Sequence, residues 1–78
     1  MRSAIDQYII NSVRDLRKKR KVSQEALAYA LGFESKAYIG AIESSNPVRD
    51  ETYNIYHLNE IAKFFNCSPK DFWPELPL

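Results

Sequence analysis

Residues 23–43 read SQEALAYALGFESKAYIGAIE, and this stretch decides the fold of the chain. It opens with Ser23, a good helix N-cap, and Glu25 follows in the first turn, where the helix dipole favours a negative charge. The apolar side chains expected to form the buried face of this helix are Ala26, Leu27, Ala30 and Leu31. Gly32 can adopt the left-handed conformation in which many helices end. The first half of the stretch therefore predicts a short helix that ends at a glycine.

The second half predicts another short helix, over Ser35–Ser44, with Ser35 as its cap. Ile39 and Ile42 would point inward, and Tyr38 would lie on the flank. Two short helices joined by a glycine-containing turn have the geometry of a helix-turn-helix. In that geometry the first helix braces the second, which fits the major groove of DNA, about 12 Å wide.

Helical signals continue before this stretch. Ser3 and Asp6 resemble a capping box at the start of a first helix. Its apolar stripe, at helical spacing, consists of Ile5, Ile9, Val13 and Leu16. The basic run Arg17–Lys21 would end this helix, because cations favour the negative end of the helix dipole.

Helical signals also continue after it. A polar connection of about ten residues, Ser44–Asn54, is longer than most helix–helix loops. Asn54 can cap a fourth helix, whose inward stripe is Leu58, Ile61, Ala62 and Phe65. Ser68 and Pro69 are a dense start signal for a short fifth helix, with Phe72 and Trp73 as its apolar side chains. No segment is typical of a strand, so we expect an all-α, compact five-helix fold.

Length and composition limit the classes of protein to which the chain can belong. We expect residues 1–78 to form a single domain, with a core over 13–73 and a tail over 74–78. No apolar run approaches the roughly 20 residues of a membrane span, and the N-terminus has no signal-peptide region. One cysteine, Cys67, gives no internal disulfide, and no Cys/His cluster offers a zinc site. No nucleophile–base constellation or phosphate-binding glycine loop is present. The sequence therefore indicates a cytoplasmic, cofactor-free protein that is not an enzyme.

The net charge of +1 conceals an uneven distribution. Residues 1–39 carry eight basic and four acidic side chains, whereas residues 40–78 carry three basic and six acidic ones. A basic half joined to an acidic half suggests that one side faces an anion such as a phosphate backbone. The alternative is that the basic run Lys18–Lys21 only closes the first helix.

Several motifs, in order, resemble one known family. In the first half of the chain they are Leu16–Lys19, Ser23–Ala28, Ala30–Phe33 and Tyr38–Glu43. In the second half they are Leu58, Ile61–Phe65 and Cys67–Phe72. Together they cover residues 13–73 and resemble the Cro and lambda-repressor-like, or XRE-type, helix-turn-helix proteins. The resemblance implies a lambda-repressor-like domain whose second and third helices form the helix-turn-helix. It also implies a repressor-like bacterial transcription regulator that binds double-stranded DNA sequence-specifically, as a homodimer on a palindromic operator.

The resemblance further implies roles for three residues. Gln24 would donate a hydrogen bond to a DNA phosphate. Arg17 and Glu43 would form an ion pair between the first helix and the end of the recognition helix, which fixes the orientation of the helices.

The groove-facing positions follow from the inward ones. Counting from Ile39 and Ile42, they are Lys36, Ala37, Gly40 and Ala41, with Ser35 near the start and Tyr38 beside them. In the connection that follows, the side chains able to reach DNA are Ser44, Ser45, Asn46 and Arg49.

Two features depart from the family pattern. One extra residue precedes Ile39, so the start of the recognition helix is uncertain by one position. Only Lys36 among the groove-facing positions carries a side chain suited to reading bases. Specificity would then come from Lys36 with DNA shape, or from the Ser44–Asn54 connection. Alternatively the small Gly40-Ala41 surface contacts a protein, as in an antitoxin-like or regulatory interaction module.

The remaining aromatic and titratable residues have simpler interpretations. His57 is expected to be an exposed helix residue, and Cys67 a partly buried apolar group. The side chains expected to seal the core are Phe64, Phe65, Phe72 and Trp73. Either Tyr53 or Tyr56 would be exposed for a partner. The apolar candidates for a dimer contact are Phe72, Trp73, Leu76 and Leu78. The alternative, equally supported, is that the tail docks on its own domain.

Overall fold

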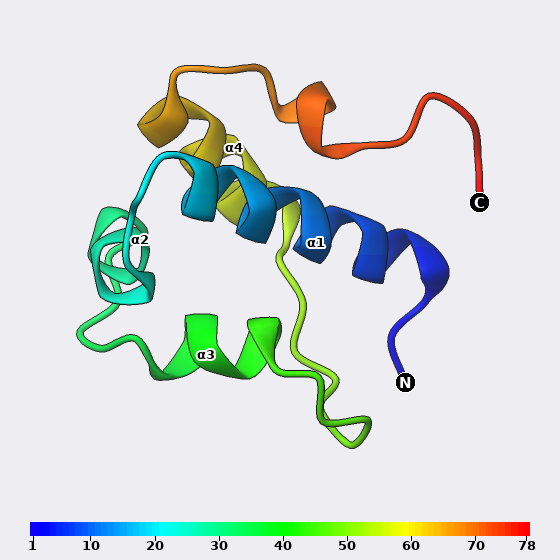
Figure 1. Ribbon diagram of the computed structural model, residues 1–78, viewed down its shortest axis with the longest axis horizontal. Helices are drawn as coiled ribbons and strands as arrows, with labels where there is room; N and C mark the ends of the chain where they lie inside the picture. The colour runs from blue at the N-terminus through cyan, green and yellow to red at the C-terminus, as the bar shows by residue number, and fades with distance from the viewer.

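Four α-helices and one 3-10 helix make up the fold, and the computed structural model describes all 78 residues (Figure 1). The first helix, α1, spans Ala4–Lys19. The Ser3 hydroxyl accepts the Asp6 amide while the Asp6 carboxylate accepts the Ser3 amide, so the predicted capping box is confirmed. The chain leaves α1 through Lys21, whose φ of 58° lies in the left-handed region.

The two short helices predicted from residues 23–43 are both present. The helix α2 spans Gln24–Ala30, and the Ser23 hydroxyl caps it by accepting the Ala26 amide at 2.9 Å. Gly32 follows with a φ of +84°, as expected of a glycine that ends a helix. The helix α3 spans Ala37–Glu43. Helix, turn and second helix therefore occur in the predicted order.

The start of α3 differs from the prediction. Lys36, not Ser35, is the N-cap residue, and its own side chain forms no capping hydrogen bond. The Ser35 hydroxyl still accepts the Ala37 amide, at 3.3 Å, and so satisfies one of the free N–H groups. At the other end Ser44 is extended and lies outside the helix. The helix α3 is therefore shorter than the predicted Ser35–Ser44 helix, by two residues at its start and one at its end.

The fourth helix follows the sequence signals closely. It is α4, which spans Ile55–Phe65, and the Asn54 side chain caps it by accepting the His57 amide at 2.7 Å. It ends at Asn66, whose φ of 55° is again left-handed. The predicted N-cap and the predicted inward stripe are both confirmed.

The fifth predicted helix is not an α-helix, so the five-helix count is not confirmed. The segment Pro69–Phe72 forms a 3-10 helix, η1, with a capping box between Ser68 and Asp71. Only four residues lie between this cap and the extended Trp73, which is too few to build a stable α-helix. The start signals therefore identified the position of a turn but not its helix type.

One hydrophobic core of 14 buried side chains joins the elements. Two alanines predicted to be buried, Ala26 and Ala30, are exposed, and Ala28 is buried instead. The reason is that α2 contacts both α3 and α4, so its buried face centres on Leu27 and Ala28. Ile10 of α1 is also buried, although it lies beside the predicted stripe.

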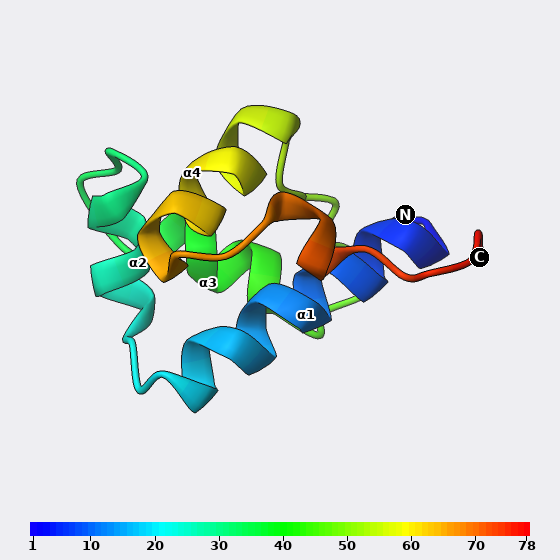
Figure 2. The same ribbon diagram turned by 90° about the horizontal axis from the view of Figure 1, so that it is seen from above.

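The arrangement leaves α3 at one edge of the molecule. In Figure 1 α3 runs along the bottom, below α1, while α4 and η1 lie above α1. Figure 2 shows the same elements from above, with η1 between α1 and α4. Only α2 and α1 contact α3 extensively, so the side of α3 that faces away from them stays open. None of the helices has the length and hydropathy that crossing a bilayer requires.

The two glycines should respond in opposite ways to replacement by alanine. Gly32→Ala is expected to destabilise the protein by about 1 kcal/mol, because its φ of +84° strains any residue with a Cβ although nothing lies within 4 Å of that atom. Gly40→Ala is expected to stabilise it by about 0.5–1 kcal/mol, because Gly40 lies inside α3 and a Cβ there meets only the Gln24 Oε1, at 3.6 Å. Thermal denaturation of both variants measures the difference. Equal shifts of the same sign would contradict this account.

Candidate nucleic-acid interface

The open side of α3 carries the groove-facing positions that the sequence predicted. Ile39 and Ile42 are completely buried and anchor the helix to the core. On the opposite side three side chains are exposed and two are half-buried: Ser35, Lys36 and Ala37, then Gly40 and Ala41. Lys36 is the one long cationic side chain in this set. The other side chains of this set are small, so a partner can approach the α3 backbone closely.

A buried ion pair fixes α3 against α1. Arg17 Nη2 donates to Glu43 Oε1 at 2.7 Å and Arg17 Nε donates to Glu43 Oε2 at 2.9 Å. The side chains are only 10% and 4% exposed. Arg17 Nη1 donates to the Val22 carbonyl at 2.8 Å, so the guanidinium also holds the chain between α1 and α2. Hydrogen bonding to Glu43 raises the pKa of Arg17, which keeps its charge permanent.

Gln24 joins this network from the first turn of α2. Its Nε2 donates to Glu43 Oε1 at 3.1 Å, so the amide lies between α2 and the last turn of α3. The amide nitrogen has two N–H groups and Glu43 accepts one of them, which leaves a second donor. The Gln24 oxygen lies beside Gly40, at 3.6 Å from where a Cβ would stand. The side chain is therefore held beside the open face of α3.

The connection after α3 is ordered mainly by local bonds. The Ser44 hydroxyl accepts the Asn46 amide at 3.1 Å, and the Asn46 side-chain oxygen accepts the Val48 amide at 3.1 Å. The Arg49 amide donates back to the Asn46 carbonyl at 3.0 Å. The side chains of Asn46 and Arg49 are exposed, and Arg49 pairs with Glu51 at 3.2 Å. Asn46 and Arg49 are thus available to a ligand, whereas Ser44 is half-buried.

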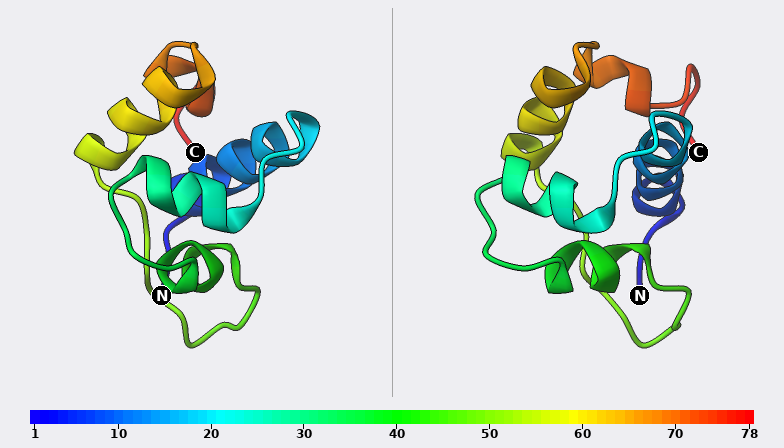
Figure 3. Two further views of the ribbon diagram at one scale, coloured as in Figure 1. Left: turned by 90° about the vertical axis from the view of Figure 1, so that its left-hand side faces the viewer. Right: turned by 60° about the vertical axis from the view of Figure 1, so that its left-hand side comes forward.

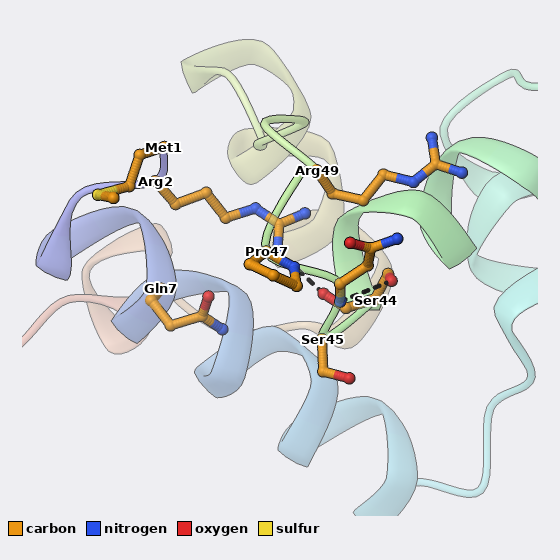
Figure 4. A pocket seen from close by; sticks show the side chains of 8 residues that line it. Met1, Arg2, Gln7, Ser44, Ser45, Pro47 and Arg49 are labelled. Atoms are coloured by element: carbon orange, nitrogen blue, oxygen red, sulfur yellow. Dashed lines mark hydrogen bonds between the residues drawn. The ribbon is translucent and has the colours of Figure 1, made fainter.

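Arg2 lies beside this connection, and sequence reasoning missed it. Figure 4 shows its guanidinium reaching from the start of α1 into a polar pocket of about 200 Å³. The same pocket is lined by residues of the connection: Ser44, Ser45, Asn46 and Arg49. The only sequence signal for this position is one basic residue before the first helix cap, which does not indicate a contact with a segment some forty residues away.

Tyr38 is a packing residue as well as a flank of α3. Its hydroxyl donates to the Thr52 carbonyl at 2.8 Å. Its ring lies 4.9 Å from Phe33 and 5.8 Å from His57, between ring centroids. These three rings join the turn before α3 to α4. Tyr38 is therefore half-buried and less free to face DNA than its neighbours.

Several of the simpler predictions need correction. His57 is half-buried, not exposed: it packs on Phe33, its Nδ1 has no hydrogen-bond partner, and burial lowers its pKa. Phe64 and Trp73 are exposed and do not seal the core, because Phe64 lies on the outer side of α4 and Trp73 is extended beyond the end of η1. Tyr53 is buried, with a pKa raised by that burial, and Tyr56 is the exposed tyrosine of the pair. Cys67 is half-buried, as predicted.

The basic run at the end of α1 does not belong to the α3 face. In both views of Figure 3 the end of α1 lies well above α3, and the turn that follows it descends beside α2. Lys18 and Lys19 occupy the last turn of the helix, where cations favour the negative dipole end. The interpretation that this run closes the helix is therefore the better one. The exposed cations beside α3 are Lys36 and Arg49, with Glu34 as an exposed acidic neighbour in the turn.

Comparison with known proteins gives one match. A family model described as helix-turn-helix matches residues 13–72, which reach from the middle of α1 to the end of η1. No curated protein and no solved structure matches the chain. The matched region contains α2, α3, both members of the Arg17–Glu43 pair and the whole connection to α4.

Proposed function

Because this chain belongs to the Cro and lambda-repressor-like (XRE-type) helix-turn-helix family, which is a DNA-binding family, we propose that it binds double-stranded DNA sequence-specifically with α3 in the major groove. We propose further that it is a repressor-like transcription regulator of a bacterial cytoplasm. The observation that carries the proposal is the open face of α3, which is held rigidly by Ile39, Ile42 and the Arg17–Glu43 pair. A helix held at one edge with one face free is the geometry that groove insertion requires.

The proposed contacts divide into backbone and base contacts. Gln24 directs its second N–H to a phosphate, and the exposed Asn46 and Arg49 bind the backbone on the other side of α3. Lys36 donates to base-edge acceptors. Along the rest of the face, small side chains allow close approach and contact with thymine methyl groups: Ser35, Ala37, Gly40 and Ala41. With a single base-reading cation, much of the specificity comes from the shape and flexibility of the DNA.

We propose a homodimer on a palindromic operator, because one recognition helix with one base-reading side chain binds weakly. Phe72 cannot form the dimer contact, since it is buried in its own core. The other three candidates are exposed and remain: Trp73, Leu76 and Leu78. The structure adds the exposed Ile55 and Tyr56, which line an apolar groove of about 520 Å³ together with Trp73, Ile5, Ile9 and Leu58.

Selection of bound sequences from a random duplex pool tests the proposal. A selected consensus with two-fold symmetry is expected, with half-sites about one helical turn apart. Affinity for that duplex should fall steeply with salt, because Lys and Arg contacts to phosphates release counterions. A consensus without symmetry would contradict the dimer only. Absence of any duplex binding at low salt would overturn DNA binding and favour the protein-interaction alternative.

Lys36→Glu should weaken binding to the selected duplex by at least about tenfold, because it removes a donor to base edges and places a carboxylate against the DNA. Fluorescence anisotropy at fixed salt measures the loss. Lys70→Glu is the matched control: Lys70 is also exposed, but it lies on η1, on the opposite side of the molecule from α3 (Figure 1). Equal losses for the two variants would show that net charge, and not the α3 face, determines binding.

A further inference from the structure

Arg2 joins the end of α3 to the connection that follows it. Its Nη2 donates to the Ala41 carbonyl at 2.9 Å, and its Nη1 donates to the Ser44 carbonyl at 3.1 Å. Its Nε donates to the Glu51 carbonyl at 2.9 Å. Ala41 and Ser44 lie where α3 ends, whereas Glu51 lies where the chain returns toward α4. One side chain therefore holds both arms of the segment 44–51, which we call the 44–51 loop.

The 44–51 loop has little else to hold it. The side chains of residues 45–50 are exposed, and their hydrogen bonds to one another are local. At its start the Ser44 amide donates to the Ala41 carbonyl at 3.3 Å, and just beyond its end the Tyr38 hydroxyl donates to the Thr52 carbonyl. Backbone without buried apolar contacts opens locally at low free-energy cost. The loop's other long-range contact is the ion pair between the N-terminal amine of Met1 and the Asp50 carboxylate, whose side chains are 97% and 68% exposed and which is therefore weak. The three part-buried bonds from Arg2 are therefore the main long-range restraint on this loop.

The charge of Arg2 is directed at the backbone and not at a carboxylate. Arg2 forms no ion pair, and its three bonds all go to carbonyl oxygens. The Ala41 carbonyl lies in the last turn of α3, where the helix dipole is negative and favours a cation. The carboxylates of Asp50 and Glu51 lie in the same loop, which makes the pocket a poor anion site in its own right. The geometry thus favours a structural task for Arg2 over direct capture of a phosphate.

We propose that Arg2 is a positioning residue, which fixes the 44–51 loop against the end of α3 and so places Asn46 and Arg49 for contact with the DNA backbone. This inference rests on the proposed function. Arg2 acts through the loop: its guanidinium donates to the backbone carbonyls, while the side chains of Asn46 and Arg49 are exposed and form no bond with it. Lysine at this position cannot replace it, because one ammonium cannot reproduce three bonds in the fixed geometry of a guanidinium.

The first test needs no DNA. In Arg2→Ala, amide hydrogen exchange measured by NMR should quicken at least about tenfold at the three hydrogen-bonded loop amides, Asn46, Val48 and Arg49. Exchange at core amides such as Ile61 should change much less. Arg2→Lys should resemble the alanine variant, and Lys70→Ala, which removes a distant cation, should resemble the wild type. Unchanged loop exchange, or equal acceleration in loop and core, would overturn the positioning role.

The second test is a double-mutant cycle with the selected duplex. Arg2→Ala should weaken binding by about tenfold in the wild-type protein but by less than about twofold in a background that carries both Asn46→Ala and Arg49→Ala, because both loop contacts are already lost there. Equal weakening in both backgrounds would show that Arg2 binds DNA independently and would overturn the proposal. If the wild-type protein binds no duplex at all, the proposed function fails, and the exchange experiment still decides whether Arg2 fixes the loop.

Discussion

Replacing Glu43 by alanine should lower the free energy of unfolding by about 3–5 kcal/mol, one of the largest losses expected from a single substitution in this protein. The variant leaves the buried Arg17 guanidinium without its two charge-assisted bonds, at 2.7 and 2.9 Å. It also removes the acceptor of the Gln24 amide. A domain of this size holds a net stability on the order of 3–5 kcal/mol, so the variant should be largely unfolded at 25 °C.

Two further variants distinguish the effect of an unpaired buried charge from the effect of removing a charge as such. Arg17→Met combined with Glu43→Leu removes both charges and keeps the apolar volume, so it should cost clearly less than Glu43→Ala alone. Lys18→Ala removes an exposed cation next to Arg17 and should change stability by less than about 0.5 kcal/mol. Urea denaturation followed by circular dichroism measures all three. If the double variant is as unstable as the single one, the damage comes from packing and not from an orphaned charge.

Local features are what the sequence predicted well. Helix caps are local, because the capping side chain and the amide it accepts are two or three residues apart. Ser3, Ser23 and Asn54 therefore each cap a helix as predicted. The Arg17–Glu43 pair is not local. It came from the resemblance to a family and not from the spacing of the two residues.

The predictions that the structure corrects failed for one physical reason, which is packing between elements that are distant in sequence. Ala28 is buried and Ala26 is exposed because α2 contacts two helices, and no periodicity within α2 reveals where both of them lie. His57 looked like an isolated exposed residue, yet Phe33 and Tyr38 cover it from across the fold. Arg2 is the extreme case, since its three acceptors lie 39 to 49 residues away.

The candidate site could be predicted in outline only. The period of the apolar residues correctly placed Ile39 and Ile42 inward, and so it also placed Gly40 and Ala41 on the other side. The period could not give the start of α3, because the side chain of the N-cap residue, Lys36, forms no capping hydrogen bond. It could not show that the Gln24 amide is already engaged by Glu43, since that bond depends on how α2 and α3 cross.

The end of the chain provides the second large effect. Phe72→Ala should lower the free energy of unfolding by about 3–5 kcal/mol, because Phe72 is 1% exposed and is among the largest completely buried side chains. It projects from η1, which contacts both α1 and α4, so its removal leaves a cavity where these elements meet. Thermal or urea denaturation measures the loss. One buried side chain therefore makes this four-residue 3-10 helix important for the stability of the whole domain.

The neighbouring residue gives a matched control. The sequence treats Phe72 and Trp73 alike, as two apolar side chains of one short helix. The structure buries the first and leaves the second 50% exposed, because Trp73 is extended and lies beyond the last turn of η1. Trp73→Ala should therefore cost only about 1–2 kcal/mol, although it removes the larger ring. If the two substitutions cost the same, Trp73 must be more deeply packed in solution than in this fold, and the apolar surface around it would no longer be free for a second copy of the chain.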